Sequence, residues 1–145
     1  MENIIERIPL LLENIKEKNP LTHCITNSVT INDCANAILA IGASPIMTED
    51  IREIEEIEKI ANALVINIGT INKIQEELIY NACEHANKNN IPIIFDPVGV
   101  GMSKLRNEIT LNLIENYKLS AIKGNMSEIK KIIGILFLLA CSHAL

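Results

Sequence analysis

Short apolar runs alternate with longer amphipathic stretches along most of the chain. Apolar runs bounded by turn residues are typical of strands that are buried on both faces of a parallel sheet. Such runs predict strands over residues 21–26, 44–47, 63–68, 91–95 and 119–122. Helical spacing of apolar residues predicts helices over residues 2–18, 28–41, 71–89 and 104–117, one that opens at Thr48, and one from about residue 126. This alternation predicts βαβ units with right-handed crossovers, and therefore an α/β fold.

Turn and cap residues define the ends of the first two predicted helices. Pro9 is expected to bend or restart the first helix, and the Asn-Pro pair at residues 19–20 is expected to end it. Asn27 or Ser28 is expected to cap the second helix, and Gly42 is expected to close it.

The C-terminal segment has a different character. Residues 132–141 are uncharged and mostly bulky and apolar, with only Gly134 as an interruption. The segment is too short to span a bilayer, which needs about 20 apolar residues. We expect it to form one buried strand or the end of a core helix, and an uncharged terminal segment of this kind is also an aggregation hazard.

Length, charge and cysteine spacing limit the class of protein. The 145 residues suffice for one domain with its own core. A net charge of −5 and a pI near 5.2, without a basic stripe, argue against a nucleic-acid partner. Four cysteines without a Cys-x-x-Cys pair suggest neither a zinc site nor a disulfide framework, but small buried residues in a reducing compartment. The acidic N-terminus shows no signal peptide, so we expect a cytoplasmic protein without a membrane partner.

Two predicted strands are followed by an acid beside glycine. Residues 91–101 run from an apolar strand into Asp96, a proline and two glycines, and Glu128 follows Gly124 shortly after the strand at 119–122. Open α/β sheets bind ligands at the carboxyl ends of their strands, and glycine lets the backbone approach a ligand closely. The predicted occupant is a divalent cation held by these carboxylates and by phosphate oxygens.

The two acids also have structural interpretations. Asn125 and Glu128 have the spacing of a capping box, in which each side chain bonds the backbone N–H of the other. Asp96 before a proline favours a turn. Both roles of Glu128 can hold, because it can cap the helix when no ligand is bound.

Other candidate residues have equally simple explanations. Gly69 and Thr70 are interpreted by default as a strand-to-helix turn with a threonine cap, and Met47 as a core residue. His23 and His85 stand beside too few other ligands for a structural metal. Four glutamates are expected on a solvated helix face: Glu53, Glu55, Glu56 and Glu58.

Five segments of the sequence resemble those of the hydroxyethylthiazole kinase family. They are residues 19–27, 42–47, 67–70, 95–101 and 123–128. They occur in the family's order and at similar spacings, from about residue 10 to residue 133. The resemblance implies a ribokinase-like three-layer fold with a mainly parallel sheet. It also implies a kinase of thiamine salvage that uses ATP and Mg²⁺ to phosphorylate the hydroxyethyl group of 4-methyl-5-(2-hydroxyethyl)thiazole, hereafter the thiazole alcohol.

The resemblance assigns four residues to the substrate. Met47 matches the family methionine that contacts the thiazole. Asn27, Gly69 and Thr70 match positions that line the same pocket. Members of the family usually form homotrimers, with this pocket between subunits.

Four further residues are assigned to the nucleotide side. Asp96 and Glu128 match the acids that organise Mg²⁺ on the phosphates. Lys123 and Asn125 match positions beside the nucleotide phosphates, and many relatives have arginine in place of Lys123. A lysine keeps the charge but loses the bidentate geometry of arginine.

The sequence also departs from the family. Family members are nearly twice as long, and their second half carries a Gly-x-Gly-Cys segment that supplies an anion hole and a proposed catalytic base. That segment does not occur in this sequence, so no catalytic residue is assigned and the chain alone is predicted to be inactive. Residues 1–134 are interpreted as the N-terminal portion of a truncated kinase domain, and residues 135–145 as an apolar tail unlike the family.

Two alternative functions stay open at this point. The first is another ribokinase-like enzyme, such as a different vitamin kinase or an ADP-dependent nicotinamide-hydrate dehydratase. The second is a non-catalytic fragment that keeps thiazole binding or subunit binding.

Overall fold

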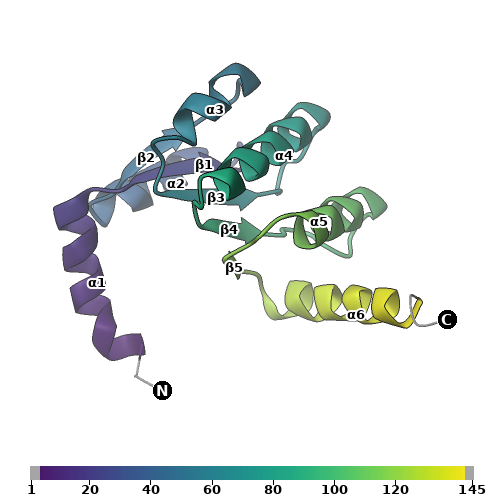
Figure 1. The fold of residues 1–145 in the computed structure, drawn as a ribbon. Helices are drawn as coiled ribbons and strands as arrows, with labels where there is room; N and C mark the ends of the chain where they lie inside the picture. The colour runs from purple at the N-terminus through teal and green to yellow at the C-terminus, as the bar shows by residue number, and fades with distance from the viewer. Residues whose placement is uncertain (1–3, 143–145) are drawn as a thin grey trace.

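The computed structural model describes residues 4–142, with side chains for residues 5–137. Its centre is a sheet of five parallel strands in the order β2-β1-β3-β4-β5 (Figure 1). The strands are β1 (Leu21–Ile25), β2 (Ser44–Met47), β3 (Ala63–Asn67), β4 (Ile93–Asp96) and β5 (Ala121–Ile122). Every predicted strand is present, and the prediction of a mainly parallel sheet is confirmed.

Helices lie on both sides of the sheet, which confirms the α/β class (Figure 1). They are α1 (Ile4–Lys18), α2 (Ile31–Ala40), the 3₁₀ helix η1 (Ile51–Glu53), α3 (Ile54–Ile57), α4 (Lys73–Lys88), α5 (Lys104–Asn116) and α6 (Met126–Ser142). They alternate with the strands, so each parallel pair is joined by a crossover.

Strand register aligns the carboxyl ends of the central strands. Ile25 of β1 pairs with Ile66 of β3, and Asn67 of β3 pairs with Asp96 of β4. Strands of a parallel sheet all end at the same edge, so the residues that end or follow β1, β3 and β4 meet there. We call this edge the carboxyl edge.

The hydrophobic core holds these strands in place. Leu64 and Ile66 of β3 and Phe95 of β4 are fully buried, and they pack with Leu78 of α4 and Leu113 of α5. Each such side chain contributes about 1.5–3 kcal/mol relative to an exposed position. The central strands therefore give the polar residues at the carboxyl edge a rigid support.

The helix predicted to open at Thr48 is shorter and begins later than expected. Asp50 caps η1 instead, and its carboxylate accepts a hydrogen bond from the Arg52 N–H at 3.0 Å. Ile54 is fully buried whereas Ile60 is 65% exposed, so the apolar stripe covers little more than one helical turn.

The ends of the first two helices follow the predicted signals only in part. Pro9 lies inside α1, which runs through it as one helix and ends before Asn19, a residue with a positive φ of 42°. α2 begins only at Ile31, because the chain first makes a turn after β1. Gly42 closes α2 with a φ of 94°, as predicted, and a Cβ there would lie 2.7 Å from Cγ of Lys16 in α1.

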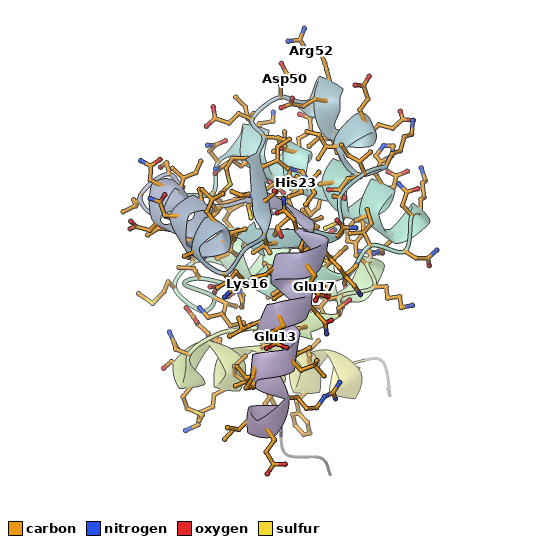
Figure 2. All side chains as sticks on the ribbon, turned by 90° about the vertical axis from the view of Figure 1, so that its left-hand side faces the viewer. Glu13, Lys16, Glu17, His23, Asp50 and Arg52 are labelled. Carbon is orange, nitrogen blue, oxygen red and sulfur yellow. The ribbon has the colours of Figure 1, made fainter. Side chains whose placement is uncertain are left out.

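The first and last helices, α1 and α6, both expose apolar side chains. α6 contains residues 132–141, so of the two expected forms, a strand or the end of a helix, the structure has the helix. Ile132 is buried, but Ile133 and Phe137 are both more than 60% exposed, so the expected core position holds only for Ile132 among these three residues. α1 stands away from the sheet, with Ile5 and Leu10 exposed (Figures 1 and 2).

Within residues 4–142, no helix combines the length and the hydropathy that a membrane crossing requires.

Candidate functional site

Hydrogen-bonded side chains connect the ends of β1, β3 and β4 across the carboxyl edge. Asn27 Nδ2 donates to Asn67 Oδ1 at 3.0 Å, and Asn67 Nδ2 donates to Asp96 Oδ2 at 3.3 Å. Lys123, directly after β5, donates from Nζ to Asp96 Oδ2 at 2.9 Å. One continuous network therefore joins a predicted substrate residue, Asn27, to a predicted metal ligand, Asp96.

Gly69 closes this network at the end of β3. Its N–H donates to Asn67 Oδ1 at 2.9 Å. A Cβ at this position would lie 2.9 Å from both Asn67 Oδ1 and Asn27 Cβ, so the close packing admits only glycine. Thr70 turns back towards β1, and its Oγ1 accepts a hydrogen bond from the Ser28 N–H at 3.0 Å.

Asn27 fixes the turn between β1 and α2. Its Oδ1 accepts hydrogen bonds from the N–H groups of Val29 and Thr30 at 3.1 and 3.0 Å. Asn27 therefore caps the turn before the helix and not the helix itself, which begins at Ile31. Its amide nitrogen stays available for the bond to Asn67.

Arg106 of α5 holds the loops after β3 and β4 together, and the sequence contained no signal for this role. Its guanidinium donates to the carbonyl oxygens of Ile68 at 2.5 Å, Val98 at 2.6 Å and Gly69 at 2.8 Å. The planar guanidinium carries five donors in a fixed geometry, which suits several carbonyls at once. Arg106 thus fixes the spacing between the Gly69 turn and the loop that follows Asp96.

Glu128 connects the start of α6 to the same loop. Its Oε2 accepts from the Asn125 N–H at 2.8 Å, while Asn125 Oδ1 accepts from the Glu128 N–H at 3.0 Å. This is the predicted capping box. Glu128 Oε1 also accepts from the N–H of Gly99 at 3.1 Å, three residues after Asp96. Both predicted metal ligands therefore lie at the loop formed by residues 96–101.

The described residues include no group of three or more His, Cys, Asp or Glu side chains placed to hold a metal ion. Mg²⁺ in nucleotide sites is usually bound by one or two carboxylates together with phosphate oxygens and water. Each carboxylate has about four lone-pair positions. Asp96 and Glu128 use two each for the bonds above, which leaves acceptor capacity for a cation, so the donor set fits Mg²⁺ bound together with a nucleotide.

Lys123 places an ammonium group beside Asp96. Its hydrogen bond to Asp96, and then the charge of that carboxylate, raise the pKa of the Lys123 ammonium. The side chain is 75% exposed, so its charge is available to a ligand in solution. Asn125, the other residue assigned to the nucleotide, has its side chain engaged in the capping box.

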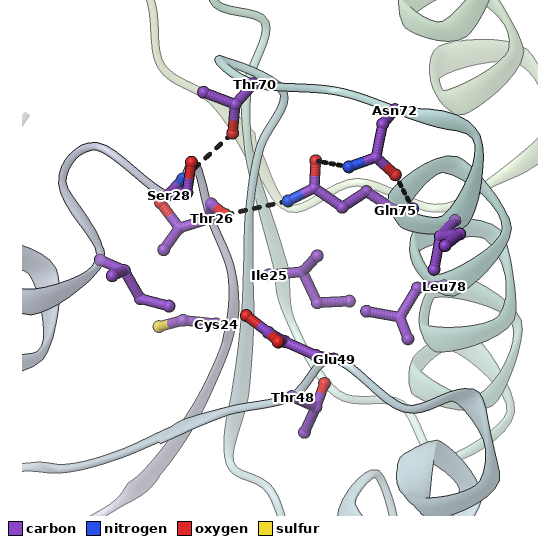
Figure 3. A pocket seen from close by; sticks show the side chains of 12 residues that line it. Cys24, Ile25, Thr26, Ser28, Thr48, Glu49, Thr70, Asn72, Gln75 and Leu78 are labelled. Carbon is purple, nitrogen blue, oxygen red and sulfur yellow. Dashed lines mark hydrogen bonds between the residues drawn. The ribbon is translucent and has the colours of Figure 1, made fainter.

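A cavity of about 330 Å³ lies beside the carboxyl edge, between β1 and the start of α4 (Figure 3). Its wall includes Cys24, Ile25, Thr48, Thr70, Gln75 and Leu78. Gln75 Nε2 donates to the carbonyl oxygen of Thr26 at 3.4 Å, which ties α4 to the end of β1. The lining mixes apolar side chains with a few hydroxyl and amide groups and one carboxylate, that of Glu49, and small-molecule sites commonly combine apolar and polar groups in this way.

The predicted substrate residues lie at different distances from this cavity. Thr70 lines it directly, although it does not cap α4, because Asn72 does so by accepting from the Gln75 N–H. Asn27 and Gly69 belong to the neighbouring hydrogen-bonded network. Met47 ends β2 and pairs in register with Cys24, which is in the cavity wall.

The buried cysteines are not nucleophiles. Burial, and then the nearby Cys34, raise the pKa of Cys24 to about 12, and burial followed by the charge of Glu58 raises that of Cys83 to about 12. A thiolate is the reactive form of cysteine, so these two residues stay in the inert thiol form near neutral pH. Their burial confirms the interpretation of Cys24 and Cys83 as core residues.

Glu58 is not on a solvated face, and this part of the prediction is wrong. Glu58 and His23 are both fully buried, and Nδ1 of His23 lies 2.5 Å from Oε1 of Glu58. The reason is that Glu58 continues the turn of α3, with its N–H bonded to the Ile54 carbonyl, so it lies on the same buried face as Ile54 and Ile57. Nε2 of His23 lies 2.7 Å from Oγ1 of Thr48, which lines the cavity.

Comparison with known proteins identifies close relatives of the chain. The family model described as "HK: Hydroxyethylthiazole kinase family" matches residues 12–140. A hydroxyethylthiazole kinase of Methanobrevibacter smithii is 62% identical over 131 residues, which cover 90% of this chain and 46% of the relative. One from Clostridium tetani is 54% identical over 132 residues, which cover 91% of this chain and 48% of the relative.

A solved structure shares the fold. The hydroxyethylthiazole kinase protein of Pyrococcus horikoshii OT3 superposes with a TM-score of 0.86 at 40% sequence identity, over 89% of this chain and 50% of the other. The chain therefore spans about half the length of the relatives it matches. The division of the sequence at residue 134 stays a prediction.

Proposed function

Since the chain belongs to the hydroxyethylthiazole kinase family, we propose that it supplies the substrate side of a kinase that phosphorylates the thiazole alcohol in thiamine salvage. The observation that supports this most is the hydrogen-bonded network from Asn27 through Asn67 to Asp96. Such a network ties the wall of an alcohol site to a group that faces phosphates. Phosphoryl transfer depends mainly on this kind of positioning and on charge neutralisation.

The thiazole alcohol is proposed to bind in the cavity beside β1. At about 330 Å³, the cavity is within the range of small-molecule sites. In this proposal Thr70 contacts the ligand from the wall, Asn27 and Gly69 hold that wall in place, and Met47 packs against the ring from the end of β2.

ATP with Mg²⁺ is proposed to bind at the loop after β4. Asp96 and Glu128 would hold the cation, which when bound neutralises charge on the phosphates. Lys123 would bind a phosphate oxygen as a point charge. Asn125 caps the N-terminus of α6, where backbone N–H groups and the helix dipole favour an anion.

A binding experiment tests the substrate side. We expect calorimetric titration of the thiazole alcohol into the 145-residue protein to show saturable binding that Met47→Asp abolishes. The matched control is Met102→Asp, at an 84% exposed residue away from the cavity, which should bind as the wild type does. An unchanged titration of Met47→Asp, or no binding by the wild type, would contradict the proposal. A panel of other alcohols separates this function from that of other ribokinase-like enzymes.

The 145-residue chain alone is expected to show no turnover with ATP and Mg²⁺, because it contains no Gly-x-Gly-Cys segment. Loss of one preorganised donor to a transition state typically lowers kcat about 100- to 1,000-fold. Thiazole phosphate detected by ³¹P NMR would contradict this expectation.

Assembly and location complete the proposal. The exposed apolar side chains of α1 favour contact between subunits, and a homotrimer is proposed on this basis and from the family resemblance. Sedimentation equilibrium should then give three times the chain mass of 16.1 kDa, and a monomer would contradict it. Cys24, Cys34 and Cys83 are free cysteines, and this supports a cytoplasmic location.

A further inference from the structure

The buried pair of His23 and Glu58 has no part in the function proposed above. We propose that both are positioning residues that set the Thr48 hydroxyl as a hydrogen-bond donor into the cavity, where it selects ligands with an acceptor atom in the ring. The inference rests on the proposed function, because the thiazole ring nitrogen is such an acceptor. The ring nitrogen is then the feature of the substrate that the cavity would recognise.

The geometry links three separate segments. His23 is in β1, Thr48 directly follows β2, and Glu58 follows α3. The contacts run in line from Glu58 Oε1 to His23 Nδ1 at 2.5 Å, and from His23 Nε2 to Thr48 Oγ1 at 2.7 Å. The side chains of His23 and Glu58 are completely buried, so water does not compete for these hydrogen bonds.

The protonation of the pair follows from its burial. Glu58 Oε2 is buried and has no hydrogen-bond partner among the described residues. A carboxylate beside a neutral imidazole would leave a net negative charge in this buried position, which is strongly unfavourable. The pair must therefore carry one additional proton, which makes it neutral overall. A proton on Oε2 would be a buried donor without an acceptor, which is also unfavourable. The extra proton is therefore shared between Oε1 and Nδ1.

This distribution fixes the direction of the second hydrogen bond. With the shared proton between Oε1 and Nδ1, the remaining imidazole proton is on Nε2 of His23. Nε2 then donates to Thr48 Oγ1, which acts as an acceptor in this bond. The hydroxyl proton of Thr48 is left to point elsewhere, and the residue lines the cavity.

The surroundings of Thr48 favour a neutral heterocycle with a free lone pair. Figure 3 shows Thr48 at the wall opposite Thr70, with Ile25, Leu78 and the carboxylate of Glu49 between them, and this carboxylate disfavours an anionic ligand. A ring that packs on these two apolar side chains would present an edge atom to the Thr48 hydroxyl. A thiazole nitrogen can accept there, whereas a ring with C–H at that position cannot.

A comparison of two ligands and three variants tests the selection. The ligands are the thiazole alcohol and the thiophene alcohol of the same shape, in which C–H replaces the ring nitrogen. We expect Thr48→Val to lower the affinity for the thiazole alcohol about 3- to 10-fold, because the net contribution of one hydrogen bond corresponds to about that factor. The affinity for the thiophene alcohol should not change. Thr48→Ser should bind both ligands as the wild type does.

The matched control is Thr110→Val, at another buried threonine, whose hydroxyl has no partner among the described residues. It should change neither affinity. If Thr48→Val affects both alcohols equally, or neither, the selection is overturned while the proposed function stands. Failure of the wild type to bind either alcohol would overturn the proposed function and, with it, the selection.

An NMR measurement tests the hydrogen-bond direction without any ligand. In protein with ¹⁵N-labelled histidine and the substitutions His85→Gln and His143→Gln, only His23 gives imidazole signals. We expect Nε2 to carry a directly bonded proton that exchanges slowly. A lone pair on Nε2 would overturn the assignment of Thr48 as a donor into the cavity. If His23 and Glu58 only stabilised the fold, the relative affinity for the two alcohols would not depend on Thr48.

Discussion

The two sides of the carboxyl edge differ in how completely this chain builds them. At β1 and β3, the candidate alcohol site is supported by a buried His–Glu pair, a close-packed glycine and the Asn27–Asn67 bond. At β4 and β5, the candidate phosphate site depends on an exposed lysine and a strand of only two residues. The candidate alcohol site and the candidate phosphate site are therefore built from regions of unequal burial.

The β5 side also has open apolar surface. Tyr117, Leu119 and Ile122 line a groove beside β5, and Ala121 of the edge strand is exposed. An edge strand of this kind has unpaired backbone groups that can bind a further strand. The relatives are about twice as long as this chain. We therefore expect the side at β1 and β3, hereafter the substrate side, to bind its ligand without further chain segments more readily than the side at β4 and β5, hereafter the phosphate side.

The largest expected effect comes from breaking the buried pair. His23→Leu leaves the Glu58 carboxyl without its partner, and removal of one member of a buried pair lowers the free energy of unfolding by about 3–5 kcal/mol. Urea denaturation followed by circular dichroism measures this change.

The control for this pair is His85→Leu, the same substitution at a half-buried position of α4. It should change the free energy of unfolding by no more than about 0.5 kcal/mol. Equal effects of the two substitutions would mean that the His23–Glu58 pair does not support the substrate side.

A pair of glycine substitutions should have effects of opposite sign. Gly69→Ala places a methyl group 2.9 Å from Asn27 Cβ, and overpacking of this kind destabilises by about 1–3 kcal/mol. Gly134→Ala, where nothing lies within 4 Å of the added atom, should stabilise α6 by about 0.5–1 kcal/mol. Thermal unfolding of both variants checks the signs, and a stabilising Gly69→Ala would contradict the close packing described for the substrate side.

The smallest effect is expected on the phosphate side. Lys123→Gln removes the bond to Asp96, and exposed ion pairs of this kind contribute about 0–1 kcal/mol to stability. The effect should decrease further in high salt. A decrease of more than about 2 kcal/mol in the free energy of unfolding would contradict the difference between the two sides, because Lys123 at β5 would then stabilise the fold about as much as a buried pair does.

Much of the fold could be predicted from the sequence because the apolar runs and turn residues are local signals. The strand ends at Asn67 and Asp96 were placed correctly within one residue, and the capping box of Asn125 and Glu128 is present. Lengths of helices were less predictable. The isoleucines that follow Thr48 at helical spacing predict a longer helix, and nothing in their pattern indicates that α3 forms only one turn.

The missed site residues depend on tertiary contacts. Glu58 is one of several neighbouring glutamates; its spacing from Ile54 places it on the buried face of α3, but only the tertiary structure supplies His23 of β1 as its partner. Arg106 lies in α5, and its carbonyl partners come from the loop just before that helix and from the more distant loop after β3. No spacing in the sequence pairs Glu58 or Arg106 with these partners, so only the folded structure reveals them.

One measurement tests the central claim, that this chain builds the substrate side of the edge by itself. Amide chemical shifts of the ¹⁵N-labelled protein are recorded while the thiazole alcohol is added. We expect changes at Ser28, Thr48 and Thr70 in the cavity wall, and none at residues 118–122 beside β5. Changes confined to the β5 side, or no changes at saturating ligand, would contradict it.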